Sequence, residues 1–283
     1  MLRIIDTVQK LFNHFPALYR LYLAFGIKDI RNGTQKLRSK LKLTHGIVKF
    51  DGFLMKLNAS SYMDLSLYHQ FLKFGLYEPD ISRYIMNTLK TGDVFVDVGA
   101  NSGYYSLLAS SLVGKSGLVY SFEPHPETFE RLKYNINLNE MENIRAYNIA
   151  LSSYDGKGTL NISRSSDGLN SLKYIPLASG KIEINVGKLD NILPNVIINT
   201  LKIDAEGAEI DIIHGASELI SRSKSLKIIF EIDKEETGQK LLDELTRLGF
   251  NSYVVQNCLF ITQVTNVKSV PKGTDNLVAV LKN

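Results

Sequence analysis

The hydrophobic pattern divides most of the chain into alternating strand-like and helix-like segments. Apolar runs predict strands at 93–98, 117–123, 144–150, 199–203, 226–232, 251–256 and 276–282. Helical spacing of apolar residues predicts helices at 103–113, 126–138, 206–221 and 234–248. Such alternation is typical of an α/β fold, in which a mostly parallel sheet carries helices on both faces.

Two departures from the alternation add elements to this fold. Upstream, alternating runs on either side of Asp51-Gly52 predict a β-hairpin, and residues 62–90 predict a helix with a kink near Pro79. Residues 152–198 carry short alternating runs around a polar loop at 163–170, which predict a β-hairpin insertion that forms one wall of a cleft. We therefore expect one domain over residues 46–283, preceded by a helical extension over residues 1–45.

Charge sets the extension apart from the domain. Residues 1–50 hold ten Lys and Arg against two acids, whereas the rest of the chain holds 23 against 27. The extension is expected to pack on the domain, and the alternative is a peripheral contact with an anionic membrane surface. No apolar run is long enough for a membrane span, and no signal peptide is indicated. The single cysteine, Cys258, favours a reducing, cytoplasmic setting.

The first strand of the alternation runs into a turn bounded by two glycines, with the sequence Val94-Phe-Val-Asp-Val-Gly-Ala-Asn-Ser-Gly103. The spacing of Gly99 and Gly103 differs from the Gly-x-Gly-x-x-Gly pattern of dinucleotide-binding folds, so a pyrophosphate is not indicated. Asp97 stands just before the first glycine, and an acid there favours a cationic ligand. We therefore expect S-adenosylmethionine (AdoMet), which carries an ammonium and a sulfonium.

The ends of the later strands add further candidate residues. Glu123 ends the second strand, where a carboxylate can accept hydrogen bonds from a ribose diol. Ala150 ends the third, where the backbone can flank an adenine. Asp204 and Glu206 follow the fourth strand and open the next helix, so an N-cap and first-turn acids explain them sufficiently. The same strand end is next to the predicted cofactor turn, where an acid could orient a methyl acceptor or take its proton.

Together these segments resemble the FkbM family of AdoMet-dependent methyltransferases. The matching motifs, in chain order, are Tyr77-Glu-Pro, Val-Asp-Val-Gly-Ala-Asn-Ser-Gly-Tyr-Tyr-Ser, Phe-Glu-Pro-His-Pro, Asn-Ile-Ala-Leu-Ser and Lys-Ile-Asp-Ala-Glu-Gly-Ala-Glu. The resemblance covers residues 70–232 and implies a Rossmann-like class I methyltransferase sheet of seven strands with the last antiparallel. It also implies AdoMet as methyl donor and O-methylation of a hydroxyl on a small molecule, a sugar or a glycolipid. Family members often carry an acid where this chain has Ser153, which leaves the adenine contact open.

The motifs and the resemblance together give two sets of expected site residues. Those expected at AdoMet are Asp97, Gly99, Ala100, Asn101, Gly103, Glu123 and Ala150. Those expected at the reacting centre are Glu78, Asp204 and Glu206, with Asp204 or Glu206 as the general base and His125 as a weaker candidate. A divalent cation is left open, because acids lie near several strand ends without any diagnostic spacing.

Two other classes of function stay as alternatives. An RNA-directed methyltransferase would use the basic extension as its electrostatic footprint. Nucleic acid is not the expected partner, because the segment after the fourth strand lacks the Asn/Asp-Pro-Pro-Tyr-type motif of amino-directed enzymes and the main domain is acidic overall. A non-catalytic AdoMet-binding module is the second alternative, and the acids at the reaction end of the predicted fold favour an enzyme over it.

Overall fold

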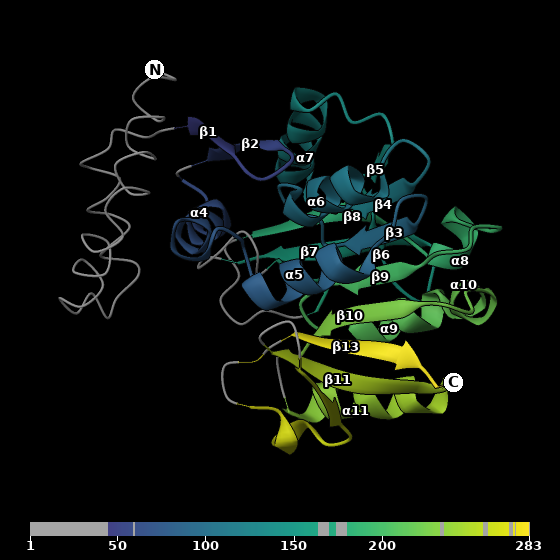
Figure 1. Cartoon of the computed structure of the whole chain (residues 1–283). Coiled ribbons are helices and arrows are strands. Elements are labelled where there is room, and N and C mark those ends of the chain that lie inside the picture. The colour runs from purple at the N-terminus through teal and green to yellow at the C-terminus, as the bar shows by residue number, and fades with distance from the viewer. Residues whose placement is uncertain are drawn as a thin grey trace.

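The computed structural model describes residues 45–58, 60–163, 170–173, 180–232, 235–256, 260–271, 274 and 276–282. Its centre is an eight-stranded sheet (Figure 1). In spatial order the strands are β12 (Phe260–Val264), β11 (Phe250–Gln256), β13 (Asn276–Leu281), β10 (Lys227–Glu231), β9 (Thr200–Ile203), β3 (Val94–Val98), β4 (Leu118–Phe122) and β5 (Ile144–Tyr147). The five strands from β10 to β5 are parallel, and β13 runs antiparallel between β10 and β11. This order is that of the expected class I methyltransferase sheet.

Helices cover both faces of the sheet. One face carries α5 (Pro79–Thr88), α6 (Tyr104–Val113) and α7 (Pro126–Leu138), and the other carries α8 (Leu189–Ile192), α9 (Glu209–Gly215), α10 (Ser217–Arg222) and α11 (Glu235–Arg247). Side chains along β3 alternate between two hydrophobic cores, one on each face of the sheet. Phe95 belongs to the core beneath α5, α6 and α7, and its neighbour Val96 belongs to the core beneath α8 to α11. Both side chains are fully buried, which is why the central strands read as continuous apolar runs.

The sequence predicted these elements with three differences. All seven expected strands are present, and β12 adds an eighth at the edge next to β11. The helix predicted at 206–221 is two helices, α9 and α10, because the chain breaks at Ala216. The third predicted strand ends at Tyr147 and not at residue 150.

Two small sheets accompany the large one. Ala150–Leu151 forms β6, which pairs with β8 (Gly180–Gly187), and β8 pairs antiparallel with β7 (Gly156–Ile162) as the hairpin expected within 152–198. The predicted hairpin around Asp51-Gly52 is β1 (His45–Lys49) and β2 (Leu54–Asn58), and a short 3-10 turn, η1 (Val267–Ser269), precedes β13.

Two asparagine side chains of α7 fasten the β1–β2 hairpin to the domain. The Asn135 Oδ1 accepts from the Lys56 amide at 2.8 Å, and the Asn139 Oδ1 accepts from the Leu54 amide at 2.6 Å. The Asn139 amide group also donates to the Leu54 carbonyl at 2.7 Å. These bonds take the place of a third strand beside β2, which satisfies part of its open edge.

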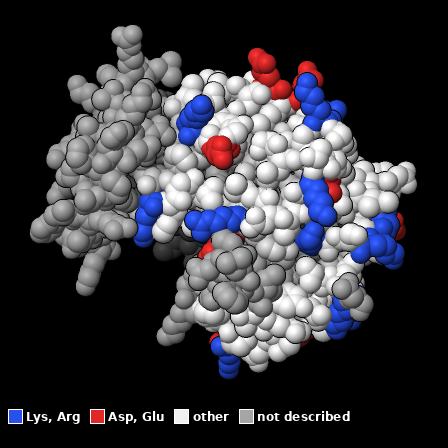
Figure 2. All heavy atoms as spheres, viewed as in Figure 1, with Lys and Arg blue, Asp and Glu red and all other residues white. Residues whose placement is uncertain are grey.

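The predicted extension over residues 1–45 falls, but for its last residue, outside the described residues, as does Cys258. Its packing, its membrane contact and the domain boundary at residue 46 therefore stay predictions. None of the helices in the described ranges is long and apolar enough to cross a membrane. On the face shown in Figure 2, the Lys and Arg side chains of the described residues are scattered singly or in small groups, some of them beside Asp and Glu side chains.

Candidate active site

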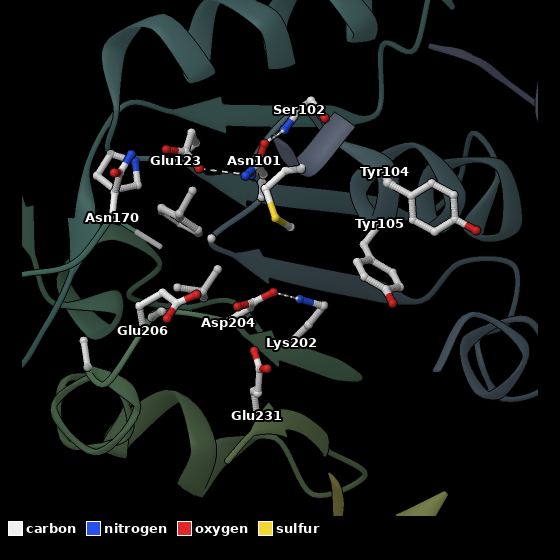
Figure 3. Close-up of a pocket in the computed structure, with 18 of the residues that line it drawn as sticks. Asn101, Ser102, Tyr104, Tyr105, Glu123, Asn170, Lys202, Asp204, Glu206 and Glu231 are labelled. Carbon is white, nitrogen blue, oxygen red and sulfur yellow. Dashed lines mark hydrogen bonds and ion pairs between the residues drawn. The ribbon is translucent and has the colours of Figure 1, made fainter. Parts of the chain in front are cut away.

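A cavity of about 460 Å³ opens beyond the carboxyl ends of β3, β4, β9 and β10 (Figure 3). Its walls come from the turn after β3, from β6, from the segment after β9 and from α4 (Tyr62–Phe74). The carboxyl edge of a parallel sheet is where ligands of such folds bind, and the volume lies within the range for a small molecule or cofactor. Nine of the ten predicted site residues either line this cavity or bound the turn beside it, and Asp97 is the exception.

Gly99 is required by a close approach between two strands. Its φ is +76°, and a Cβ placed on it would lie 1.9 Å from the carbonyl oxygen of Asp204. A side chain at this position would therefore strike the backbone that follows β9. The glycine thus serves the contact between the two strand ends, whereas the sequence analysis had placed it only in the turn and among the residues expected at AdoMet.

The backbone amides of the turn after β3 are already hydrogen-bonded within the protein. The amides of Gly99 and Ala100 both donate to the Phe122 carbonyl at 3.0 Å, and that of Gly103 donates to the Ala100 carbonyl at 2.9 Å. The Ser102 amide donates to the Asn101 side chain at 2.7 Å. Binding of a phosphate at a turn depends on amide groups that point at the ligand. The turn is therefore not a phosphate cradle, in line with the expectation of a cationic ligand.

Glu123 lies at the end of β4 and faces the cavity. Its Oε2 accepts from the Asn101 amide at 3.0 Å and its Oε1 accepts from the His125 amide at 2.8 Å. Burial raises the pKa of Glu123 to about 7, although these two hydrogen bonds and Arg131 act to lower it. The carboxylate is thereby fixed in place, and each oxygen keeps lone pairs for further donors.

Asp97 does not line the cavity. Its side chain is only 1% exposed and lies beneath the turn, where its Oδ2 accepts from the Ser106 hydroxyl at 2.6 Å. The Oδ1 has no hydrogen-bond partner among the described residues. Burial raises the pKa of Asp97, and the nearby Lys202 opposes that rise. The alternation of β3 places Asp97 on the same face as Phe95, toward α6, so it supports the turn from below.

Lys202 is a buried cation that the sequence argument did not single out. It is 2% exposed, its Nζ lies 3.0 Å from the Asp204 Oδ2 and 4.7 Å from the centre of the Tyr105 ring. Burial lowers the pKa of Lys202, but Asp204, Asp97 and Glu78 raise it by more, so the net pKa lies above its ordinary value. A lysine inside the otherwise apolar run Leu201–Ile203 was the signal available in the sequence.

Glu78, at the N-cap position of α5, lies near Lys202 and Tyr105. The Tyr105 hydroxyl donates to the Glu78 Oε2 at 2.6 Å, and both residues line the cavity. Burial raises the pKa of Glu78, and Lys202 acts to lower it. The residue before it, Tyr77, also lines the cavity and was not predicted.

Asp204 and Glu206 line the cavity on the segment between β9 and α9. The expectation that Asp204 caps a helix is wrong, because α9 begins at Glu209 and its N-cap is Ala208, without a side-chain cap. Figure 3 shows the carboxylates of Asp204, Glu206 and Glu231 on one side of the cavity, with Glu123 and Asn101 on the other. Glu231, at the end of β10, is therefore an additional acid at the site.

Three residues of the cavity hold unusual backbone conformations. Glu78, Asn101 and Glu206 have φ values of 39°, 48° and 49° in the left-handed region, and Glu140 is the other non-glycine residue with positive φ in the described chain. Non-glycine residues in this region are strained by roughly 1–3 kcal/mol and persist where the surrounding structure holds them. Their concentration around one cavity is typical of a functional site.

Helix α4 is tied to the turn after β3 by a buried acid. Asp64 is 1% exposed, its Oδ1 accepts from the Ser102 hydroxyl at 2.8 Å, and its Oδ2 lies 3.2 Å from the Arg131 Nη1. The same helix contributes Tyr62 and Gln70 to the cavity. The wall formed by α4 is thus positioned by the turn it faces.

The structure also places His125, the weaker candidate for the reacting centre, and Asn170 of the polar loop. The His125 ring accepts from the Thr128 amide at the start of α7, and His125 is not among the cavity-lining residues. Asn170, at the end of the polar loop expected to wall the cleft, does line the cavity, and residues 164–169 lie outside the described ranges. No group of three or more His, Cys, Asp or Glu residues in the described chain is arranged to hold a metal ion.

Comparison with known proteins identifies the family of the chain. A family model described as the Methyltransferase FkbM domain matches residues 97–252, more than half of the chain. The hexuronic acid methyltransferase AglP of Haloferax volcanii is 29% identical over 189 residues, 61% of this chain and 73% of that protein. Methyltransferase 1 of Beauveria bassiana is 28% identical over 148 residues, 44% of this chain, and the match spans 58% of that relative.

A solved structure of methyltransferase FkbM from Methylobacillus flagellatus overlaps 77% of this chain and 54% of its own. Its TM-score is 0.47 and its sequence identity 16%.

Proposed function

The chain belongs to the FkbM methyltransferase family and uses AdoMet as its methyl donor, and from that premise we propose that it methylates a hydroxyl oxygen of a small molecule, most simply a sugar or a glycolipid. The observation that carries the proposal is the set of carboxylates from Glu78, Asp204, Glu206 and Glu231 beside the glycine turn. A hydroxyl is a poor nucleophile, and a carboxylate within hydrogen-bond reach can take its proton. The name of the Haloferax relative supports a sugar as the acceptor class.

The residues around the turn fit AdoMet. Glu123 would accept hydrogen bonds from the ribose hydroxyls, because its two oxygens are held in the cavity wall by backbone amides. The turn from Gly99 to Gly103 would flank the methionine part, and Ala150, on β6 in the cavity wall, would flank the adenine. Asp97 contributes by holding the turn and not by contact.

The chemistry needs little from the protein beyond positioning and a proton acceptor. Bound AdoMet supplies an electrophilic methyl group on a sulfonium. Asp204 or Glu206 would take the proton of the acceptor hydroxyl, and the ion pair of Lys202 with Asp204 would hold that carboxylate in one orientation. Glu78 and Tyr105 would fix the far wall of the acceptor space through their hydrogen bond.

The test is methyl transfer by the full chain with AdoMet and a panel of hydroxylated sugars and sugar-lipids. Formation of S-adenosylhomocysteine (AdoHcy) and a mass gain of one methylene on the acceptor would be measured together. We expect Asp204→Asn and Glu206→Gln to bind AdoMet and to lower turnover, by about 10²-fold or more for the proton acceptor. Glu142→Gln, an exposed acid away from the cavity, is the matched control. Full turnover in both cavity variants would remove the general-base role, and methylation of nitrogen only would refute O-methylation.

A further inference from the structure

Tyr105 lies where the turn after β3 passes into helix α6. It stands two residues after Gly103, the N-cap of that helix, and its buried side chain lines the cavity. The Leu107 amide donates to the Gly103 carbonyl at 2.9 Å, so the end of the turn and the first turn of the helix form one hydrogen-bonded unit. The position of Tyr105 relative to the turn is therefore set by helical backbone.

The two parts of the Tyr105 side chain contact different charged groups. Its hydroxyl donates to the Glu78 Oε2 at 2.6 Å, and its ring centre lies 4.7 Å from the Lys202 Nζ. The Lys202 Nζ in turn lies 3.0 Å from the Asp204 Oδ2, and Figure 3 shows Lys202 with Asp204 on one side and Tyr105 on the other. One tyrosine thus links an acid at the start of α5 to an acid that follows β9.

Burial makes both contacts effective. Lys202 is 2% exposed, and a cation over an aromatic face is stabilised more when water is excluded. A hydrogen bond to an ionised carboxylate is likewise stronger than one between neutral groups. Burial raises the pKa of Glu78, Lys202 and the Tyr105 hydroxyl act to lower it, and Asp204 acts to raise it. Tyr105 therefore favours the ionised form of Glu78.

Neighbouring aromatic rings hold Tyr105 in one orientation. The Tyr104 ring packs edge-on against it, with 5.2 Å between the ring centres, and the Tyr77 ring lies at 6.1 Å. The Tyr104 hydroxyl accepts from the Tyr77 amide at 3.2 Å and lies 3.1 Å from the Ser82 hydroxyl, so this neighbour is fixed as well. A side chain held in this way can orient the groups that it contacts.

We propose that Tyr105 is a positioning residue of the reacting centre, whose hydroxyl holds Glu78 and whose ring holds Lys202 against Asp204. One side chain would then fix both carboxylates relative to the turn that flanks AdoMet. The inference rests on the proposed function for what the two acids do, whereas the contacts themselves can be measured without an acceptor.

The experiment separates the hydroxyl from the ring. Tyr105→Phe removes only the hydroxyl, and Tyr105→Leu removes both. Tyr84→Phe and Tyr84→Leu are the matched controls, because Tyr84 on α5 is buried in the same hydrophobic core and is not among the cavity-lining residues. All variants are made in the full chain.

The hydroxyl is tested by carbon NMR of a chain labelled at the glutamate carboxyl carbons, with the Glu78 signal assigned through Glu78→Gln. The pKa of Glu78 should rise in Tyr105→Phe, because the carboxylate loses a donor, and should stay at the wild-type value in Tyr84→Phe. The same pKa in wild type and Tyr105→Phe would overturn the inference. This readout keeps the test decisive if Tyr105→Leu does not fold.

The ring is tested by the rate at which acetic anhydride acetylates Lys202, followed by mass spectrometry of peptides. Tyr105→Leu should raise this rate at least about tenfold, because the ring no longer covers the ammonium, whereas Tyr105→Phe should stay within about twofold of wild type. An unchanged rate in Tyr105→Leu would overturn the inference. An equal rise in Tyr84→Leu would also overturn it, because the effect would then be one of general loosening of the core.

Turnover connects the contacts to the reaction. With an acceptor that accepts a methyl group from AdoMet, kcat should fall about tenfold in Tyr105→Phe and about a hundredfold in Tyr105→Leu, while the KM for AdoMet stays within about threefold. Full kcat in Tyr105→Leu would refute the positioning role and leave the proposed function standing. If no hydroxyl is methylated, the proposed function fails, and the NMR and acetylation results still decide whether Tyr105 holds Glu78 and Lys202.

Discussion

If Glu123 binds the ribose of AdoMet as proposed, its buried carboxylate should make the affinity for AdoMet depend on pH. Burial raises the pKa of Glu123 to about 7, so a large part of the free protein carries a neutral Glu123 just below neutrality. A ribose diol donates hydrogen bonds, and the ionised carboxylate accepts them best. Lowering the pH through 7 should therefore remove the ionised form, which is the form expected to bind the ribose.

The size of the effect follows from the pKa. If only the ionised form binds, the apparent dissociation constant scales with the reciprocal of the ionised fraction. With a pKa of about 7, the affinity should be about tenfold weaker at pH 6 than at pH 8, which corresponds to about 1.4 kcal/mol. Above pH 8 the affinity should level off, because nearly all of Glu123 is then ionised.

Stability should change with pH in the opposite direction. The folded chain binds a proton at Glu123 more tightly than the unfolded chain, so the free energy of unfolding falls as the pH rises from the ordinary value of 4.5 to about 7. This pKa shift lowers the free energy of unfolding at pH 8 by about 3 kcal/mol relative to its value at low pH. Glu123→Gln removes this cost but leaves one backbone amide without its acceptor, at about 1–3 kcal/mol. The variant should thus unfold at a temperature close to that of the wild type.

Calorimetric titration of AdoHcy between pH 5.5 and 8.5 measures the affinity directly. We expect the affinity of the wild type for AdoHcy to fall about tenfold from pH 8 to pH 6. We expect Glu123→Gln to bind weakly, with no dependence on pH. Glu123→Gln retains the His125 ring, so the variant separates the contribution of Glu123 from that of His125. A wild-type affinity that is flat from pH 6 to 8, or a slope that persists in Glu123→Gln, would refute the role of Glu123.

Three other changes test the remaining parts of the site. Glu206→Gly and its control Glu140→Gly should each raise the free energy of unfolding by up to about 1 kcal/mol in denaturant titrations, because both relieve a left-handed φ. Only Glu206→Gly should lower turnover, because it also removes a carboxylate from the cavity, and equal activity in the two variants would remove Glu206 from the proposed catalytic residues. Lys202→Met should lower the free energy of unfolding by about 3–5 kcal/mol at neutral pH, because it leaves buried carboxylates without their cation. The loss should be smaller at pH 5, where these carboxylates are more protonated, and a loss that does not depend on pH would contradict the electrostatic account. Gly99→Ala should lower the free energy of unfolding by about 3 kcal/mol or more, or should prevent folding, because its Cβ would strike the Asp204 carbonyl. Thermal unfolding measures this loss, and a stable variant with normal AdoHcy affinity would contradict the contact.

The order of strands and the place of the cavity could be predicted from the sequence because both follow from local pattern. Strand-end residues such as Glu123 and Asp204 were found because parallel strands end at one edge of the sheet. The direction of a side chain within a strand was harder to predict. Asp97 looks like a ligand-facing acid in the motif, yet the pleat of β3 turns it toward α6.

Long-range pairing accounts for the other differences. Asp97 and Lys202 are register partners on the adjacent strands β3 and β9, and only the assembled sheet brings that buried pair together. Ala150 reads as the end of a strand from its apolar neighbours, but its hydrogen-bond partners lie on β8, far along the chain. The start of α9 at Glu209 follows from the left-handed Glu206, a conformation that residue preferences do not favour.

Because the backbone at Gly99 lies against the carbonyl of Asp204, the proposed donor side and the proposed acceptor side of the cavity meet at one seam. Their separation is set by the spacing of neighbouring strands, about 4.8 Å, and no hinge or loop has to bring them together. Under the proposed roles, mutations in α4 or in the β7–β8 hairpin should exchange one acceptor for another while the alignment of methyl donor and proton acceptor is inherited unchanged. Divergence of substrate in this scaffold should accumulate in those outer walls and spare the seam.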